Sequence, residues 1–525
     1  MALVAAWTTA SAWPQAKGLG RLDQSLDTGA ALSASGDGTL VPSGEDKRAW
    51  TIVPRVTLQE TITDNVALGQ ARKESDQITE VSPGVRVEAN TRRLTLHADY
   101  ALRELYYAQG TRDTGTQNSL NAQGRLEAIE NLLFVDMTGT IARQNISAFG
   151  AQSTGNYNVN ANNTETRSFH VSPYIKARLG SPTDYELRYG RTTTRSKSNL
   201  VSDADTDEWT GRLNGRTPLA VLDWSAEAIR QQYDYSQGRN SESDRVRGFL
   251  TYRVNPQFKL SASVGRERND FTSLSKQSWT THGLGADWAP TERTEISAFR
   301  EKRFFGYGHA YSLSHRFPMS AVKFSDMRDI SSQPNQFGAG GLGNIYDLMF
   351  AQMASAVPDP IERAAQVNAF LSVVGIAPNM LVNTGFLSSQ VTAQRRQELS
   401  WLLRGVRNTL TLAATRGKND RLGVGLGAGD DFSVASSVDQ RGFSIGWAHQ
   451  LTSLSSLSVA AAQSRSTGEF SSQNQNGRQR TLSASLSTKL GAKTSAALTA
   501  RRNKSDGTTQ PYTENALVGS VAIQF

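Results

Sequence analysis

The feature that most constrains this chain is a period-two alternation of apolar and polar residues, which begins near Trp50 and continues to Phe525. Between Arg93 and Arg103, for example, every second residue is apolar or aromatic, and most residues between them are polar or charged. The segments 171–179, 258–265 and 482–490 show the same pattern. An α-helix would repeat every 3.6 residues, so the alternation predicts β-strands with two unlike faces.

Three further features distinguish a membrane barrel from a soluble β-sandwich. Segments such as 131–146 and 432–450 exceed the ~5–6 residues usual in soluble sheets and suit a tilted crossing of the bilayer. The predicted connections alternate between tight turns and longer polar loops, for example 145–163, 236–243, 418–431 and 466–477. The chain also ends on an apolar strand with a final aromatic residue.

The tight turns give the expected strand number. They fall near residues 90, 130, 181, 217, 256, 290, 318, 406, 452 and 491. About ten turns of this kind predict roughly eleven hairpins and about 22 strands, an even number as in bacterial barrels. We therefore expect an all-β, transmembrane, antiparallel up-and-down barrel whose lumen is too wide for side chains alone to fill.

Composition agrees with this fold and excludes several others. Only 38% of the residues are hydrophobic, as expected when every second strand residue faces lipid. No run approaches the ~18 apolar residues of a membrane helix. Cysteine is absent, which excludes disulfides and thiolate metal sites. The net charge of +8 is spread along the sequence, so we expect no nucleic-acid partner.

Three regions follow from the pattern. Residues 1–16 resemble the end of a secretory signal peptide, with the cleavage-type tripeptide Ala10-Ser11-Ala12, although a soluble N-terminus is an alternative. Residues 17–49 are predicted to be a flexible periplasmic leader, and residues 50–525 the barrel. The final strand resembles the signal that barrel-insertion machinery recognises in a Gram-negative bacterium. Its outward positions are Val521, Ile523 and Phe525.

Residues 332–390 interrupt the alternation. Helical spacing is predicted at 344–356 and again at 361–374, with Asp359 as N-cap and Pro360 at the first helical position. The order of the turns places this insertion on the extracellular side. We expect either a lid that folds into the mouth or an outer cap without a gating role. The residues expected to form the lid are Tyr346, Phe350, Asp359, Pro360, Arg363 and Phe370.

A family resemblance becomes specific at two places. The first strand, from Trp50 to Val66, and the inserted segment 345–371 resemble the porin-type outer-membrane barrels associated with the PEP-CTERM/exosortase system. The resemblance covers most of the chain after the leader. It implies a barrel that works with exopolysaccharide and exosortase machinery in polymer or protein export, and it brings no catalytic residues.

The phase of each strand predicts which charged residues face the lumen, because charge facing lipid at mid-bilayer costs about 2–4 kcal/mol for Arg or Lys. One interpretation is a network of ion pairs that makes a wide barrel rigid. The other is a mildly basic pathway for an anionic or hydroxyl-rich polymer, with Tyr174 and Phe249 as stacking surfaces. The predicted inward cations are Arg86, Arg93, Arg103, Lys176, Arg178, Arg188, Arg212, Arg216, Arg245, Arg247, Arg253 and Arg404. The predicted inward acids are Glu88, Asp99, Glu186, Asp223, Glu227, Asp287 and Glu398.

Motifs that suggest catalysis or metal binding have ordinary structural explanations. The hydrolase-like pattern Gly442-Phe443-Ser444-Ile445-Gly446 lies inside a predicted strand, whereas that chemistry needs a strand-to-helix turn. Asp203, Asp205 and Asp207 have partial calcium-loop spacing, but the required glycine and final glutamate are missing. A polar loop is the simpler interpretation, with divalent bridging to lipopolysaccharide as the alternative. We expect no enzyme activity, cofactor or metal.

Two functions remain open. The first is a porin-like channel that exports exopolysaccharide or another secreted polymer. The second is a non-conducting scaffold that anchors a surface or matrix partner through its extracellular loops. In both cases the expected partners include outer-membrane lipid, lipopolysaccharide and the barrel-insertion machinery.

Overall fold

The structure is a computed structural model that describes residues 49–158, 160–178, 180, 183–219, 221–332, 335–336, 385–423, 430–433, 435–470, 475–507 and 510–525. Twenty-two long strands form its wall. They are β1 (Trp50–Thr63), β2 (Asp76–Asn90), β3 (Leu94–Tyr107), β4 (Gly115–Ile129), β5 (Leu133–Asn145), β6 (Asn163–Arg178), β7 (Thr183–Ser196), β8 (Ala204–Arg216), β9 (Leu222–Tyr235), β10 (Ser241–Asn255), β11 (Phe258–Asn269), β12 (Gln277–Thr291), β13 (Thr294–Arg303), β14 (Gly306–Arg316), β15 (Ser320–Ser331), β18 (Thr392–Arg404), β19 (Asn408–Arg421), β20 (Ala435–Gln450), β21 (Ser455–Phe470), β22 (Gln475–Lys489), β23 (Thr494–Gly507) and β24 (Tyr512–Gln524).

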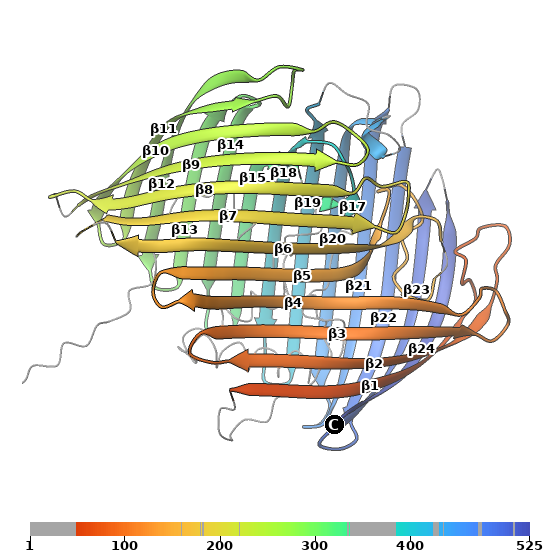
Figure 1. Ribbon diagram of the computed structural model, residues 1–525. Helices are drawn as coiled ribbons and strands as arrows, with labels where there is room; N and C mark the ends of the chain where they lie inside the picture. The colour runs from red at the N-terminus through yellow and green to blue at the C-terminus, as the bar shows by residue number, and fades with distance from the viewer. Residues whose placement is uncertain are drawn as a thin grey trace, which may run out of the picture.

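The wall closes on itself. Each strand pairs antiparallel with its neighbours in the chain, β15 pairs with β18, and β1 pairs with β24 from Arg55 opposite Gln524 to Thr63 opposite Ala516. Figure 1 shows the two terminal strands side by side, with the C-terminus at one end of the barrel. The predicted closed antiparallel barrel of about 22 strands is therefore confirmed.

The outer face of the wall is apolar. In β20, the side chains of Phe443, Ile445 and Trp447 are exposed, whereas Ser444 between them is buried on the opposite face. The same alternation exposes Leu250 in β10 and Leu482 in β22. Because these side chains have no protein to pack against, their natural solvent is hydrocarbon.

The two ends of the barrel differ. At the end that holds Trp50 and Phe525, which we call the turn end, ten short connections join the strands at the predicted positions. At the opposite end, which we call the loop end, the connections include the long segments 146–162 and 332–391. Short turns are periplasmic and long loops extracellular in outer-membrane barrels, so the loop end faces outward.

Two predicted loops are shorter than expected. Residues 466–477 were predicted as one loop, but β21 continues to Phe470 and β22 begins at Gln475. The predicted loop 418–431 likewise begins later, because β19 continues to Arg421. Polar residues on both faces end the apolar pattern there. The ladder of backbone hydrogen bonds nevertheless continues, because strands of 14–16 residues extend beyond the hydrocarbon layer.

The helical insertion was predicted over residues 332–390, and both of its predicted helices, 344–356 and 361–374, lie outside the described residues. Its two ends are described: the two-residue strands β16 (Asn335–Gln336) and β17 (Phe386–Leu387) pair with each other at the loop end. The only helical turn in the described residues is the 3-10 turn Asp431–Ser433. The described part of the chain contains no helix long and apolar enough to span a membrane.

A lipid-facing wall makes a depth-dependent prediction. Leu250→Arg places a charge on the outer face in the middle part of β10, and it should lower the free energy of unfolding by about 2–4 kcal/mol. Val254 lies on the same outer face, one residue from the turn end of β10. Val254→Arg should therefore lower the free energy of unfolding by only about 0–1 kcal/mol. Denaturant titration in lipid vesicles measures both values, and equal costs would contradict the assignment of this face to lipid.

Candidate functional site: the lumen wall and its outer mouth

The inner wall has two chemically different halves. On β4–β15 the inward positions carry many charged side chains, including Asp136, Arg247 and Glu301. On β19–β23 the inward positions are mainly small, hydroxyl-bearing or apolar. Inward hydroxyl residues of this second half are Thr409, Thr411, Thr415, Ser444, Ser456, Ser458, Ser483, Ser485, Ser487 and Thr499. Both halves are hydrophilic, as a water-facing wall requires.

A chain of ion pairs, which we call the girdle, crosses the charged half. It begins at Arg125 on β4, whose Nε lies 2.7 Å from Asp136 Oδ1, and continues through Arg188, whose Nη1 lies 3.0 Å from Asp136 Oδ2. It ends where Arg247 bridges two strands. The intermediate contacts join Arg188 to Glu186 at 3.2 Å, Glu186 to Arg212 at 3.8 Å, Arg212 to Glu227 at 3.0 Å, Glu227 to Arg247 at 2.5 Å and Arg247 to Glu301 at 3.2 Å.

Glycines allow Arg247 to reach across the sheet. Arg247 stands on β10 and Glu301 on β13, so the guanidinium must pass over β11 and β12. At Gly265 an added Cβ would lie 2.8 Å from Arg247 Cγ and 2.3 Å from the carbonyl oxygen of Val246. At Gly283 it would lie 3.0 Å from Glu301 Cβ. The absence of side chains at these two glycines gives the Arg247 side chain room to lie flat across β11 and β12. The side chains of Arg247 and Glu301 are both fully buried.

The predicted inward cations separate into three groups. Arg188, Arg212 and Arg247 belong to the girdle. Arg86 contacts Asp99 at 3.2 Å, Arg103 contacts Glu80 at 3.8 Å, Arg253 contacts Asp223 at 2.9 Å, and Arg245 is buried on β10. The rest lie near the turn end, where the structure does not join them to the girdle: Arg93, Lys176, Arg178, Arg216 and Arg404.

Several residues of these clusters were not predicted. Arg55 donates to both carboxylate oxygens of Asp99 and is almost fully buried. Arg303 contacts Glu267 at 2.7 Å and also pairs with Asp329. The alternation does contain the signal, because Arg303 and Glu301 share a phase in β13. Which inward charge meets which, however, depends on strand register, which the sequence pattern does not reveal.

The loop between β5 and β6 folds into the barrel, a feature the sequence did not indicate. Its Tyr157 packs on Ile78, Leu105 and Ala516, which are inward residues of β2, β3 and β24. The carbonyl oxygen of Gln152 in the same loop accepts a hydrogen bond from the hydroxyl of Tyr512 at 2.6 Å. The loop therefore lines the inner wall at the loop end and narrows the mouth.

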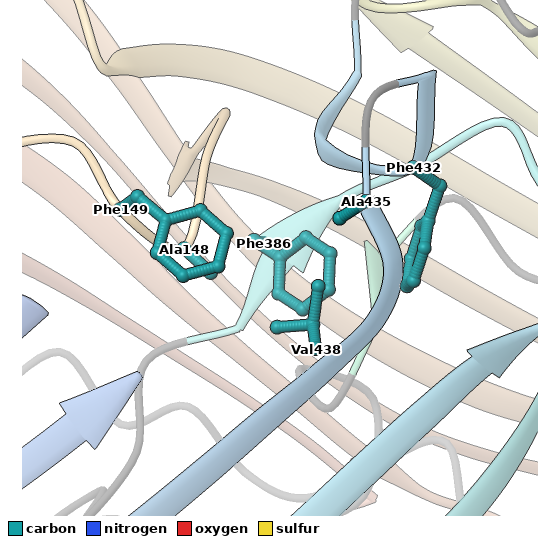
Figure 2. Close-up of a cluster of buried hydrophobic side chains, with 6 residues drawn as sticks. All are labelled: Ala148, Phe149, Phe386, Phe432, Ala435 and Val438. Atoms are coloured by element: carbon teal, nitrogen blue, oxygen red, sulfur yellow. The ribbon is translucent and has the colours of Figure 1, made fainter. Parts of the chain in front are cut away.

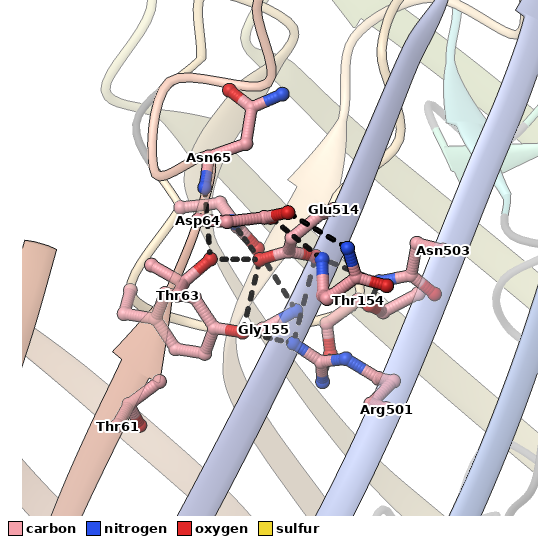
Figure 3. Close-up of polar contacts among 12 residues, drawn as sticks. Thr61, Thr63, Asp64, Asn65, Thr154, Gly155, Arg501, Asn503 and Glu514 are labelled. Atoms are coloured by element: carbon pink, nitrogen blue, oxygen red, sulfur yellow. Dashed lines mark hydrogen bonds and ion pairs between the residues drawn. The ribbon is translucent and has the colours of Figure 1, made fainter. Parts of the chain in front are cut away.

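Glu514 is the anchor of this loop. Its carboxylate is buried on β24 and accepts hydrogen bonds from the Tyr157 hydroxyl at 3.0 Å and Asn158 Nδ2 at 2.8 Å. Thr63 Oγ1 and Asn503 Nδ2 donate to it from the neighbouring strands at 3.2 and 2.8 Å (Figure 3). Burial raises the pKa of the Tyr157 hydroxyl, which keeps it protonated and able to donate.

A second contact joins loops from opposite sides of the mouth. Phe386 of β17 packs with Phe149 of the β5–β6 loop and with Phe432 and Val438 of the β19–β20 region (Figure 2). Phe386 also pairs in parallel with Asn145 at the end of β5. Because β5 lies half a circumference from β15 and β18, the described residues 385–391 before β18 reach across the mouth.

Two adjacent carboxylates hold this junction. Asp431 accepts hydrogen bonds from Ser147 Oγ at 2.6 Å and from the Ala148 amide at 2.7 Å. Asp430 accepts from Ser388 Oγ at 2.8 Å and from the Ser389 amide at 3.0 Å. The β19–β20 loop thus ties the β5–β6 loop to the β15–β18 connection, and we call this contact the three-loop junction.

The other sequence motifs take structural places. Ser444 of the hydrolase-like pattern lies within β20, and Asp205 contacts Arg195 at 2.8 Å. His309 and Asp326 contact each other at 3.0 Å. Within the described ranges, no group of three or more His, Asp or Glu residues is placed to hold a metal.

The predicted lid residues Tyr346, Phe350, Asp359, Pro360, Arg363 and Phe370 lie outside those ranges. Val521, Ile523 and Phe525 are exposed on the outer face.

A closed wall of twenty-two strands with an apolar outer face and a hydrophilic inner face defines an integral protein of the bacterial outer membrane.

No family model matches the sequence, and no curated protein matches it. Among solved structures, the fold is similar to the FrpB iron transporter of Neisseria meningitidis in its F5-1 variant apoprotein form, at 10% identity and a TM-score of 0.49, covering 91% of this chain and 82% of that one. It is also similar to BauA, the ferric preacinetobactin receptor of Acinetobacter baumannii, at 11% identity and a TM-score of 0.47, covering 90% and 80%. OccK11 of Pseudomonas aeruginosa has 11% identity and a TM-score of 0.33, with coverage of 90% and 96%.

The girdle predicts a large effect at Arg247. Arg247→Ala leaves the buried Glu301 carboxylate without this partner and should lower the free energy of unfolding by about 3–5 kcal/mol. Arg253→Ala is the matched control, because the Arg253–Asp223 pair is partly exposed and should contribute about 0–1 kcal/mol. Denaturant titration in vesicles measures the free energy of unfolding of both variants. A similar decrease in the two would show that the buried Arg247–Glu301 pair stabilises the barrel no more than an exposed pair does.

The three-loop junction predicts a pH dependence. Burial, reinforced by the neighbouring Asp430 charge, raises the pKa of Asp431 from 3.8 to about 6. A raised carboxyl pKa favours the protonated form in the packed junction, so its stability is fully present below pH 3.8 and is lost as the pH rises through about 6. The other charged group at this turn is Arg421, which donates to the Phe432 carbonyl oxygen at 2.7 Å.

Hydrogen exchange measures this effect. The protection factor of the Ala148 amide, corrected for intrinsic exchange, should fall between about pH 4 and pH 6.5 and then stay constant, because the Asp431 carboxyl has a pKa of about 6 in the packed junction and its ordinary value of 3.8 when the junction is open. In Asp431→Asn the fall should disappear, because the amide does not titrate. A wild-type protection factor that stays constant over this range would contradict the prediction.

Proposed function

We propose that this barrel is a channel for hydrophilic cargo whose outer mouth is gated by the β5–β6 loop and the three-loop junction. The observation that carries the proposal is the contrast between wall and mouth. The wall is wide and hydrophilic and is held by the backbone ladder, whereas the mouth is crossed by loops that are held mainly by side-chain contacts. Side-chain contacts across a wide lumen can release without any change in the strands.

The cargo that we propose is an exported polysaccharide. Neutral sugars offer hydroxyl groups that match the Ser- and Thr-rich half of the wall, and acidic sugars offer carboxylates that match arginine. Tyr174, one of the two residues predicted as stacking surfaces, is buried and contacts both Phe134 and the guanidinium of Arg188, so the support for this cargo comes from the arginines and hydroxyl groups of the wall. The resemblance to barrels of the PEP-CTERM/exosortase system supports the same class of cargo.

We also propose that the inserted segment 337–384 acts as a lid. Its support is the helical spacing in the sequence and the position of its two ends, because the β16–β17 ladder holds them together at the mouth. Leu387 packs there with Ile146 and Val201 from two other loops. Deletion of residues 337–384 should raise conductance if the segment is a lid and leave it unchanged if it is an outer cap.

A second function has its own support. The loops at the mouth share buried apolar contacts, and a permanently packed mouth would present a fixed extracellular surface. Such a barrel would be a non-conducting scaffold that anchors a surface or matrix partner. The two functions differ in one measurable property, which is whether ions pass through the barrel after the mouth contacts are weakened.

Planar-bilayer recording of the purified protein tests the proposal. Glu514→Ala removes the anchor of the β5–β6 loop and should raise conductance several-fold, because the loop can then leave the inner wall. Ser520→Ala, on the inner face of the same strand near its turn end, should have the conductance of the wild type. Added polysaccharide should then interrupt the current. If neither the wild type nor the Glu514→Ala variant conducts ions, the result would favour the non-conducting scaffold function.

A further inference from the structure

Five cations gather on the outer, lipid-side face of the barrel at its loop end. Arg465 on β21, Arg478 and Arg480 on β22, and Arg502 and Lys504 on β23 are all exposed. Each has the same phase as the exposed leucines of its neighbourhood, such as Leu482, so these side chains point away from the lumen. We call this set the cationic patch.

The register of the strands brings like charges together. Arg465 lies directly opposite Arg478, and Arg480 lies directly opposite Lys504. Residues opposite each other in an antiparallel pair have Cβ atoms about 4.5–5.5 Å apart, and like charges there are destabilising. The patch therefore carries an electrostatic cost that an external anion would remove.

The protein supplies few acids to neutralise the patch. Glu469 and Asp506 are the only acids in β21, β22 and β23. Asp506 contacts Arg480 at 3.8 Å and Lys504 at 3.2 Å. Within the described ranges, neither Arg465 nor Arg502 has an ion-pair partner.

Other outward arginines at the loop end differ in this respect. Arg395 contacts Asp326 at 2.6 Å, and both Arg416 and Arg441 contact Asp439, at 2.9 and 3.2 Å. The barrel thus gives each of these three arginines a carboxylate partner, with Asp439 shared by Arg416 and Arg441. It leaves most of the charge of the cationic patch available to another molecule.

Apolar side chains continue from the patch toward the turn end. Arg502 lies opposite Leu482, and Leu486 and Leu498 follow with exposed side chains on the same outer face. A ligand that matches this surface carries phosphates at the height of the arginines and acyl chains along the leucines. Arginine binds phosphate oxygens with two parallel hydrogen bonds, which suits a ligand with several phosphates.

We propose that the cationic patch is a binding site for a phosphorylated glycolipid of the outer leaflet, that is, for lipopolysaccharide. The patch lies on the extracellular side, at the depth where the phosphates of that leaflet meet the strands. It is separate from the lumen, so bound glycolipid covers the outside of the barrel and neutralises Arg465, Arg478, Arg480, Arg502 and Lys504 without entering the channel.

Glycolipid binding to the full-length protein in detergent tests the site. The unfolding temperature, followed by the mobility difference between heated and unheated protein on gels, should rise when lipopolysaccharide is added. Arg465→Gln/Arg480→Gln/Arg502→Gln should raise the dissociation constant at least about tenfold at moderate salt. The matched control is Arg230→Gln/Arg395→Gln/Arg416→Gln, which removes the same charge from outward arginines at the same end of the barrel that have carboxylate partners of their own, and it should bind as the wild type does.

Two further arms identify the ligand. Lipopolysaccharide stripped of its phosphates and the anionic phospholipid phosphatidylglycerol should each stabilise the wild type much less than intact lipopolysaccharide does. The triple Arg→Lys variant at positions 465, 480 and 502 keeps the charge and should retain most of the binding, which guards against misfolding of the glutamine variant. Equal binding by the glutamine variant and its control, or equal stabilisation by either of the other lipids, would overturn the proposal.

Discussion

The structure depends on closure of the backbone hydrogen-bond ladder. In hydrocarbon, an unpaired peptide group costs several kcal/mol, so a sheet with a free edge cannot stay in the membrane. Pairing of β1 with β24 removes both edges at once. Once the ladder is closed, each strand has one face toward lipid and one toward water. The apolar outer belt, the charged girdle and the hydroxyl-rich half of the wall all follow from that division.

The same division explains how much the sequence could predict. A period of two specifies which face a residue occupies, so strand number, turn positions and the outward phase of Phe443, Ile445 and Trp447 could be predicted. Register is different, because partners such as Arg247 and Glu301 lie 54 residues apart and meet only after β11 and β12 have been placed. The alternation can therefore nominate inward charges, but it cannot pair them or separate the girdle from turn-end residues such as Arg178.

The mouth was harder still to predict. Nothing in the sequence of the β5–β6 loop marks Tyr157 as a residue that packs inside the barrel, because its partners come from β2, β3 and β24. The cationic patch was hidden for the same reason. Its five residues span 40 positions of the chain and appear dispersed in sequence, but register places them on three adjacent strands. Contacts between residues that are far apart in the chain leave little signal in the local sequence pattern.

The position of Glu514 has a consequence for the order of assembly. This carboxylate belongs to the final strand, yet it anchors a loop that belongs to the first third of the chain. A barrel that still lacks β24 would have neither its lateral seal nor the anchor that holds the β5–β6 loop against the wall. Sealing and narrowing of the pore are therefore completed by the same strand, and an incompletely inserted barrel would leak both through its side and through its mouth.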